Sequence, residues 1–191
     1  MTPSDYLSLP ADLPAPADDG ACDHLPGLKL PAIALPSTAG RPVVLAEQKG
    51  LTVVYCYPMS GRPGVPLPQG WDQIPGARGC TPQSCGFRDR YAEFAGLHVA
   101  VYGLSTQTTD YQQEFAQRIH LPFDLLSDSD LRFTAALRLP TFEVDGKTLI
   151  KRLTLVLRDG AIQKVFYPVF PPDRHAEELL AWLRSGGAGS A

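Results

Sequence analysis

The sequence lacks features that would place the protein in several common classes. No uninterrupted apolar run reaches the roughly 18 residues that a membrane-spanning helix needs. Positive charge is not in excess, because 17 Lys and Arg residues face 20 Asp and Glu residues and the formal net charge is -3. This balance excludes a generally basic protein that coats nucleic acid, although it leaves a local basic patch open. We therefore expect neither a membrane nor a nucleic-acid partner.

The beginning of the chain also lacks the parts of a secretory signal. Residues 1–20 contain neither a basic region nor an apolar core. We therefore expect a cytoplasmic, reducing location, in which cysteines are more often catalytic or metal-binding than structural. The chain has four of them, which are Cys22, Cys56, Cys80 and Cys85.

Proline, in contrast, is abundant. It accounts for 19 of the 191 residues, about twice its usual share of roughly 5%. Of these prolines, 13 lie at or before Pro75. We interpret residues 1–24 as a proline-rich N-terminal arm, 25–185 as one folded domain, and 186–191 as a flexible tail.

Strand-like and helix-like segments alternate from residue 25 onward. Buried strands are expected at Leu51–Tyr57, His98–Leu104, Lys151–Leu157 and Ala161–Tyr167, with a short apolar piece at Asp124–Leu126. Helices are expected from Cys80 to about Phe94 and at Thr109–His120, Leu131–Leu137 and Pro171–Arg184. The Asp159-Gly160 pair predicts a hairpin between the last two strands. This order predicts an α/β, thioredoxin-like three-layer sandwich with a mixed central sheet.

Cys80 stands at the junction between a long loop and a predicted helix. The unpaired N–H groups and the positive end of the helix dipole favour a thiolate there, and the nearby Arg78 adds positive charge. The thiolate is the nucleophilic form of cysteine. The alternative is a buried, inert cysteine, which is the interpretation we favour for Cys56 inside its strand. A zinc site is the remaining alternative, but the chain has no second close pair of cysteines and its histidines are scattered, so we expect no metal.

Cys85 follows Cys80 by five positions. In a continuous helix this step rises about 7.5 Å and turns about 500°, so the two sulfurs point apart. A disulfide needs α-carbons within about 6.8 Å, so a bond between these cysteines requires the helix to unwind locally. Such a pair suits transient redox chemistry better than a structural role.

Several short motifs then occur in the order found in one family. They are GCTPQSCGFRD at Gly79–Asp89, VYCYP at Val54–Pro58, GLST at Gly103–Thr106, FDLLSD at Phe123–Asp128, and Arg152 in KRLTLVLRDG. On these motifs, residues 25–185 resemble the peroxiredoxins of the AhpC/TSA family. The similarity is greatest to the bacterioferritin-comigratory-protein branch.

The resemblance implies a thiol-dependent peroxidase that acts on hydrogen peroxide or organic hydroperoxides. Cys80 matches the peroxidatic cysteine, which attacks the peroxide and becomes a sulfenic acid. Cys85 matches the resolving cysteine, which condenses with it to an intramolecular disulfide. Arg152 matches the arginine that holds the thiolate and polarises the peroxide. Such an enzyme needs no cofactor, is reduced by thioredoxin or a similar dithiol, and is a monomer or weak homodimer.

The resemblance also extends to the substrate pocket. Gln83 matches the Glu or Gln position that hydrogen-bonds the arginine, and Pro58 keeps the family's proline in sequence order. The family threonine three residues before the peroxidatic cysteine is absent, because Ala77 stands there. Ser60, Thr81 or a backbone N–H are the candidates to replace it.

An insertion at about 59–78 explains this departure most simply. It contains Trp71, for which two roles are equally compatible with the sequence: covering the pocket or anchoring the loop to the surface. The altered loop keeps an alternative function open, namely a non-enzymatic redox sensor or partner-binding protein on the same fold. A disulfide oxidoreductase ranks last, because such proteins usually carry C-x-x-C and this chain has C-x-x-x-x-C.

Overall fold

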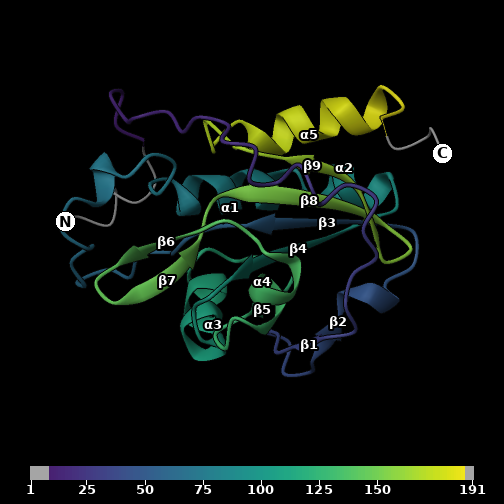
Figure 1. Cartoon of the computed structure of the whole chain (residues 1–191), viewed down its shortest axis with the longest axis horizontal. Coiled ribbons are helices and arrows are strands. Elements are labelled where there is room, and N and C mark those ends of the chain that lie inside the picture. The colour runs from purple at the N-terminus through teal and green to yellow at the C-terminus, as the bar shows by residue number, and fades with distance from the viewer. Residues whose placement is uncertain (1–8, 188–191) are drawn as a thin grey trace.

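A five-stranded mixed sheet forms the centre of the protein (Figure 1). The structure, a computed structural model, describes residues 9–187. The strands lie in the order β5 (Leu125–Ser127), β4 (Val99–Ser105), β3 (Leu51–Cys56), β8 (Leu153–Arg158) and β9 (Ala161–Phe166). The β3–β4 and β4–β5 pairs are parallel, whereas β3–β8 and β8–β9 are antiparallel. The predicted mixed sheet and the hairpin at Asp159-Gly160 are therefore confirmed.

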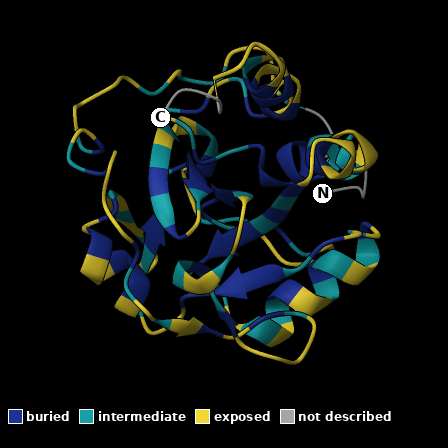
Figure 2. Cartoon of the chain, turned by 90° about the vertical axis from the view of Figure 1, so that its right-hand side faces the viewer, coloured by how far each residue is buried: buried dark blue, intermediate teal, exposed yellow. Residues whose placement is uncertain are grey.

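Alternation along β3 divides the core between the two faces of this sheet. Val53 and Tyr55 point to the face that is covered mainly by α1 (Cys80–Asp89), α2 (Tyr91–Gly96) and α5 (His175–Arg184). Val54 and Cys56 point to the other face, where α4 (Arg132–Leu137) and residues 22–45 pack. The remaining helix, α3 (Thr109–Arg118), packs beside β5. These layers make the thioredoxin-like sandwich, and Figure 2 shows its buried strands between helices with exposed outer faces.

Two small sheets were not predicted. One pairs β1 (Ala34–Leu35) with β2 (Val43–Val44), and the other is a hairpin of β6 (Thr141–Val144) and β7 (Lys147–Ile150). Two short 3-10 helices accompany them, at Leu45–Glu47 and Trp71–Gln73. In Figure 1 the β6–β7 hairpin projects from the sandwich toward the loop that precedes α1. This hairpin borders the functional site described below.

Several predicted element boundaries were wrong. The helix expected from Cys80 to Phe94 is divided at Arg90, whose backbone leaves the helical conformation at φ -106° and ψ 9°. His98 and His120 have positive φ angles of 56° and 55°, so His98 lies before β4 and His120 lies after α3. Two other elements begin later than predicted. The strand expected from Lys151 begins at Leu153 (β8), and the helix expected from Pro171 begins at His175 (α5).

The N-terminal arm is packed on the domain rather than extended away from it, over the part that the structure describes. Cys22 is buried in the core, and the Asp19 carboxylate forms a 2.8 Å ion pair with Lys151. The Tyr167 hydroxyl donates a second hydrogen bond of 2.8 Å to Asp19. Residues 1–8 and 188–191 of the expected arm and tail lie outside the described residues. No helix among the described residues is long and apolar enough to cross a membrane.

Candidate active site

Cys80 is the first residue of α1 and is almost completely buried, with 4% of its surface exposed. The preceding Gly79 has a φ of 104°, a conformation that side-chain-bearing residues rarely adopt. A Cβ on Gly79 would also collide with the side chains of Pro172 and Leu9. Glycine at this position therefore allows the loop to turn into the helix while two packed side chains cover it.

Arg152 lies directly before β8. Its guanidinium donates hydrogen bonds both to the sulfur of Cys80 and to the loop that precedes Cys80 in the sequence. Its Nη2 donates to Cys80 Sγ at 3.1 Å, and only 3% of the residue is exposed. The same guanidinium donates to three successive carbonyls, at 3.2 Å to Gly76, 3.1 Å to Ala77 and 3.2 Å to Arg78. The arginine thus fixes the loop and places a positive charge against the thiol sulfur.

Gln83 completes the contacts of this guanidinium. Its Oε1 accepts a hydrogen bond from Arg152 Nη1, and the residue is fully buried one turn into α1. Thr81 is buried as well, next to Cys80, and Pro58 is buried two residues after the end of β3. The structure therefore brings together the cysteine, the arginine and the glutamine that sequence motifs singled out.

A small cavity of about 20 Å³ borders Cys80 and Thr81. Its other walls come from the insertion and the turn into α1, and consist of Met59, Gly61, Leu67, Trp71, Arg78 and Gly79. This volume is enough for roughly one water-sized group. The insertion therefore leaves, beside Cys80, a cavity that is only large enough for a small polar molecule.

Trp71 takes both of the roles that the sequence left open. It is 4% exposed and packs with Ala77 and Leu149 in a small core between the insertion and the β6–β7 hairpin. Its ring centroid lies 6.2 Å from that of Phe142 in β6. It also lines the cavity beside Cys80, so it both anchors the loop and covers the site. Sequence reasoning missed the hairpin half of this contact, although Asp145-Gly146 is the same kind of turn signal as Asp159-Gly160 and could have revealed it.

Two other expected participants are engaged elsewhere. The Ser60 hydroxyl donates to Gln107 Oε1 at 3.0 Å, so it does not take the position of the missing family threonine. Arg78 forms a 3.2 Å ion pair with Asp72 inside the insertion, and Arg152 is the cation at hydrogen-bond distance from the sulfur. At the threonine position, the Ala77 carbonyl accepts hydrogen bonds from Arg152 and, at 3.7 Å, from the Cys80 thiol.

The other three cysteines differ from Cys80 in their surroundings. Cys85 lies on the same unbroken helix and is half-buried, and burial raises the pKa of its thiol. Burial raises the pKa of Cys22 to about 12 and raises that of Cys56 strongly. Neither of these last two thiols is readily ionised, so the interpretation of Cys56 as a core residue agrees with its place in β3. All four cysteines are free.

The Redoxin family model matches residues 25–180 of this chain. A chloroplastic peroxiredoxin Q from Sedum lineare is 35% identical over 157 residues, which span 81% of this chain and 75% of that protein. The chain belongs to the peroxiredoxins. A putative peroxiredoxin bcp from Coxiella burnetii is 30% identical over 162 residues and is matched over 97% of its length. The resemblance noted in the sequence to this branch is thereby confirmed.

Solved structures of peroxiredoxins agree with the fold. Peroxidoxin BcpB from Mycobacterium tuberculosis superposes with a TM-score of 0.68 at 29% identity, over 85% of this chain and 98% of that one. PrxQ from Xylella fastidiosa superposes with a TM-score of 0.69 at 21% identity, over 86% of this chain and 98% of that one. The thioredoxin-like architecture predicted from the sequence is that of these neighbours.

Proposed function

We propose that this peroxiredoxin reduces hydroperoxides at Cys80, with Arg152 as the group that holds and activates the sulfur. The supporting observation is the 3.1 Å contact between Arg152 Nη2 and Cys80 Sγ in a buried site. A fixed guanidinium stabilises the thiolate and also the negative charge that develops on the departing oxygen. Its other hydrogen bonds, to Gln83 and the loop carbonyls, keep it from reorienting during the reaction.

In the first step the Cys80 thiolate attacks the terminal oxygen of the hydroperoxide. A sulfur–oxygen bond forms as the oxygen–oxygen bond breaks, and the sulfur is oxidised while the peroxide is reduced. The departing oxygen takes a proton and leaves as water or an alcohol. Cys80 becomes a sulfenic acid, a state that remains reversible while a thiol can reach it.

In the second step Cys85 supplies that thiol. Its sulfur attacks the sulfenic sulfur of Cys80, a disulfide forms, and water leaves. Because α1 is continuous from Cys80 to Asp89, the first turn has to unwind before the sulfurs can meet. A thioredoxin-like dithiol protein then reduces the disulfide by thiol–disulfide exchange.

The remaining functional assignments belong to the same proposal. Pro58 and Thr81 form part of the substrate pocket, a role supported for Thr81 by its place on the cavity wall. The enzyme is a monomer or weak homodimer of the cytoplasm, without a nucleic-acid or membrane partner. Its free cysteines suit a reducing compartment, and its net charge of -3 does not favour nucleic acid.

Peroxide consumption coupled to thioredoxin and its reductase tests this proposal. Wild-type protein is expected to turn over hydrogen peroxide continuously, Cys80→Ser to show no turnover, and a Cys56→Ala control to behave as wild type. If the wild type consumes a single equivalent and then stops, the protein is a redox sensor rather than a peroxidase. Normal turnover by Cys80→Ser would overturn the assignment of the reactive cysteine.

A further inference from the structure

The loop that precedes α1 is covered by the N-terminal arm. A Cβ built on Gly79 would lie 2.8 Å from Leu9 Cδ2, and one built on Gly76 would lie 3.3 Å from Pro16 Cγ. The arm therefore rests against both glycines of this loop, and residues 9–18 form a strap across it. In Figure 1 the purple strap lies at the end of the sandwich where α1 and α5 begin.

Contacts that follow the strap in the sequence tie it to the domain. The carboxylate of Asp19 pairs with Lys151 at 2.8 Å and accepts a hydrogen bond from the Tyr167 hydroxyl, also at 2.8 Å. Cys22 then enters the core, with 5% of its surface exposed. Because Lys151 is the neighbour of Arg152, the strap is fastened beside the residue that holds the sulfur.

The strap itself is attached by side chains. Within residues 9–187, no backbone hydrogen bond joins residues 9–18 to the rest of the domain. Its prolines, Pro10, Pro14 and Pro16, have a fixed φ, so the strap loses less conformational freedom on packing than a flexible segment would. A segment held by few contacts also opens at a low free-energy cost. The strap is therefore suited to cover the loop and to leave it reversibly.

The strap touches the part of α1 that has to move in the resolving step. The first hydrogen bond of the helix runs from the Gln83 N–H to the Gly79 carbonyl at 3.0 Å. The sulfurs of Cys80 and Cys85 meet only when this first turn unwinds. Unwinding displaces Gly79, and the contact with Leu9 is lost with it. The strap therefore stabilises the wound form of the turn.

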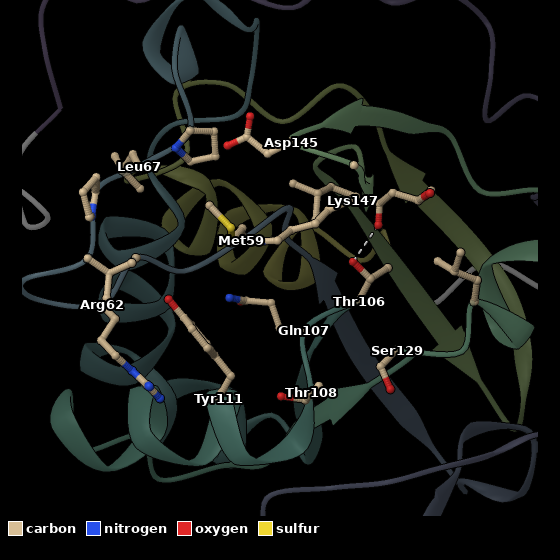
Figure 3. Close-up of a pocket in the computed structure, with 18 residues that line it drawn as sticks. Met59, Arg62, Leu67, Thr106, Gln107, Thr108, Tyr111, Ser129, Asp145 and Lys147 are labelled. Atoms are coloured by element: carbon tan, nitrogen blue, oxygen red, sulfur yellow. Dashed lines mark hydrogen bonds between the residues drawn. The ribbon is translucent and has the colours of Figure 1, made fainter.

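The insertion, in contrast, leaves room for this movement. A pocket of about 530 Å³ lies on its outer side and shares Met59, Gly61 and Leu67 with the small cavity at Cys80. In Figure 3, Met59 and Leu67 border the central space of this pocket together with Tyr111 of α3. Displacement of these side chains gives an unwound turn the space that the cavity of about 20 Å³ lacks. The turn can therefore open toward the insertion, whereas the strap holds the loop at its two glycines.

We propose that Leu9 and Pro16 are positioning residues, which hold the loop before Cys80 in its folded form and thereby set the rate at which α1 unwinds for attack by Cys85. The inference rests on the proposed peroxidase function. By linkage, a contact that favours the wound turn is itself weakened when the turn unwinds. Formation of the disulfide between Cys80 and Cys85 therefore releases the strap.

The rate of unwinding decides the fate of the sulfenic acid. Attack by Cys85 forms the disulfide and releases water. A second hydroperoxide instead transfers an oxygen to the sulfenic sulfur, which becomes a sulfinic acid, and the rest of the hydroperoxide leaves as water or an alcohol. Thiols do not reverse this second oxidation. A strap that slows unwinding therefore raises the share of Cys80 that is lost as sulfinic acid.

Rapid-quench mass spectrometry of reduced protein with excess hydrogen peroxide separates these steps. Leu9→Ala is expected to leave the rate of Cys80 oxidation unchanged, because Arg152 still holds the sulfur. Disulfide formation should become about fivefold faster, since a half-buried leucine contributes roughly half the contact energy of a buried one, and the yield of sulfinic acid should fall.

Two control variants separate positioning from general stability. Leu28→Ala is the matched substitution, because Leu28 is 40% exposed and lies outside the strap, and both of its rates should equal those of wild type. Leu9→Met keeps an apolar side chain of similar volume against Gly79 and should restore the wild-type rate of disulfide formation. Unchanged or slower disulfide formation in Leu9→Ala, or equal changes in both steps, would overturn the proposal.

Limited proteolysis follows the strap directly. Endoproteinase Asp-N cleaves before aspartate, and Asp12 is exposed within the strap. Cleavage before Asp12 should be faster in the disulfide form, prepared with diamide, than in the reduced form. Cleavage before Asp130, which is exposed in the turn before α4, should be the same in both. Equal cleavage before Asp12 in the two forms would overturn the release of the strap. Absence of sulfenic acid at Cys80 in the wild type would instead refute the peroxidase function, and the proteolysis would still decide the role of the strap.

Discussion

Replacement of Arg152 by alanine is expected to slow the reaction of Cys80 with hydrogen peroxide by about 100- to 1,000-fold. This is the usual loss when one preorganised donor to a developing negative charge is removed. The structure gives a second reason for a loss of this size. The same guanidinium bonds the carbonyls of Gly76, Ala77 and Arg78, so the loop before Cys80 also loses its anchor.

Arg152→Lys distinguishes charge from geometry. A lysine ammonium keeps the positive charge but is a point donor without the planar fork of arginine. It cannot hold Cys80, Gln83 and three carbonyls together, so we expect a rate between those of wild type and Arg152→Ala.

Stopped-flow fluorescence is the assay for these variants. The chain has two tryptophans, and a Trp182→Phe background leaves Trp71, which lines the cavity at Cys80, as the reporter. Arg132→Ala serves as the control, because that side chain is 65% exposed and lies on α4. A folded Arg152→Ala protein that reacts within about threefold of wild type would refute the role given to this arginine.

Two further predictions concern the support of the site. Gly79→Ala should lower both the melting temperature and the peroxide rate, since the added Cβ meets Pro172 and Leu9 at a positive φ; unchanged values in calorimetry and stopped flow would contradict this packing. The hydrogen bond from Lys151 lowers the pKa of Asp19 from 3.8 to about 2. Its stabilising effect is therefore present above pH 4 and lost as the pH falls through 2. The melting temperature of Asp19→Asn should consequently fall less than that of wild type between these pH values, and parallel curves would refute the contribution of this ion pair.

The central sheet was predictable because its strands are short apolar runs with clear boundaries. Leu51–Cys56 is rich in β-branched and aromatic residues, and Asp159-Gly160 is a strong turn signal. The helix at Cys80 was also recognised, but its division at Arg90 was not, because the apolar spacing of Phe87 and Phe94 continues across the break. Periodicity reports which residues face the core and is insensitive to one non-helical residue between two helices.

The site could be predicted only in part. The resemblance to the family motifs singled out Arg152 and Gln83. The fold brings both side chains to the site, Arg152 from 72 positions beyond Cys80 and Gln83 from the same helix. The contact between Trp71 and Phe142 could not be foreseen, because both segments are irregular or partly exposed and meet only through tertiary packing. Local patterns carry no information about such long-range contacts.

The same limit applied to the N-terminal arm. Its proline content predicted an irregular segment, and residues 9–24 have no helix or strand. The composition did not reveal that Cys22 enters the core or that Asp19 pairs with Lys151, 132 positions away. Irregular backbone and packing on a domain are independent properties, and only the first is visible in composition.

The most direct test of the account is to locate the oxygen that peroxide transfers to the protein. Reduced Cys85→Ser is mixed with one equivalent of hydrogen peroxide, trapped with dimedone and mapped by mass spectrometry. The account predicts one dimedone adduct per chain, at Cys80, because that sulfur lies beside Arg152 while Cys22 and Cys56 are buried thiols with raised pKa values. An adduct at Cys22 or Cys56, or a reduced Cys80 after the peroxide is consumed, would contradict it.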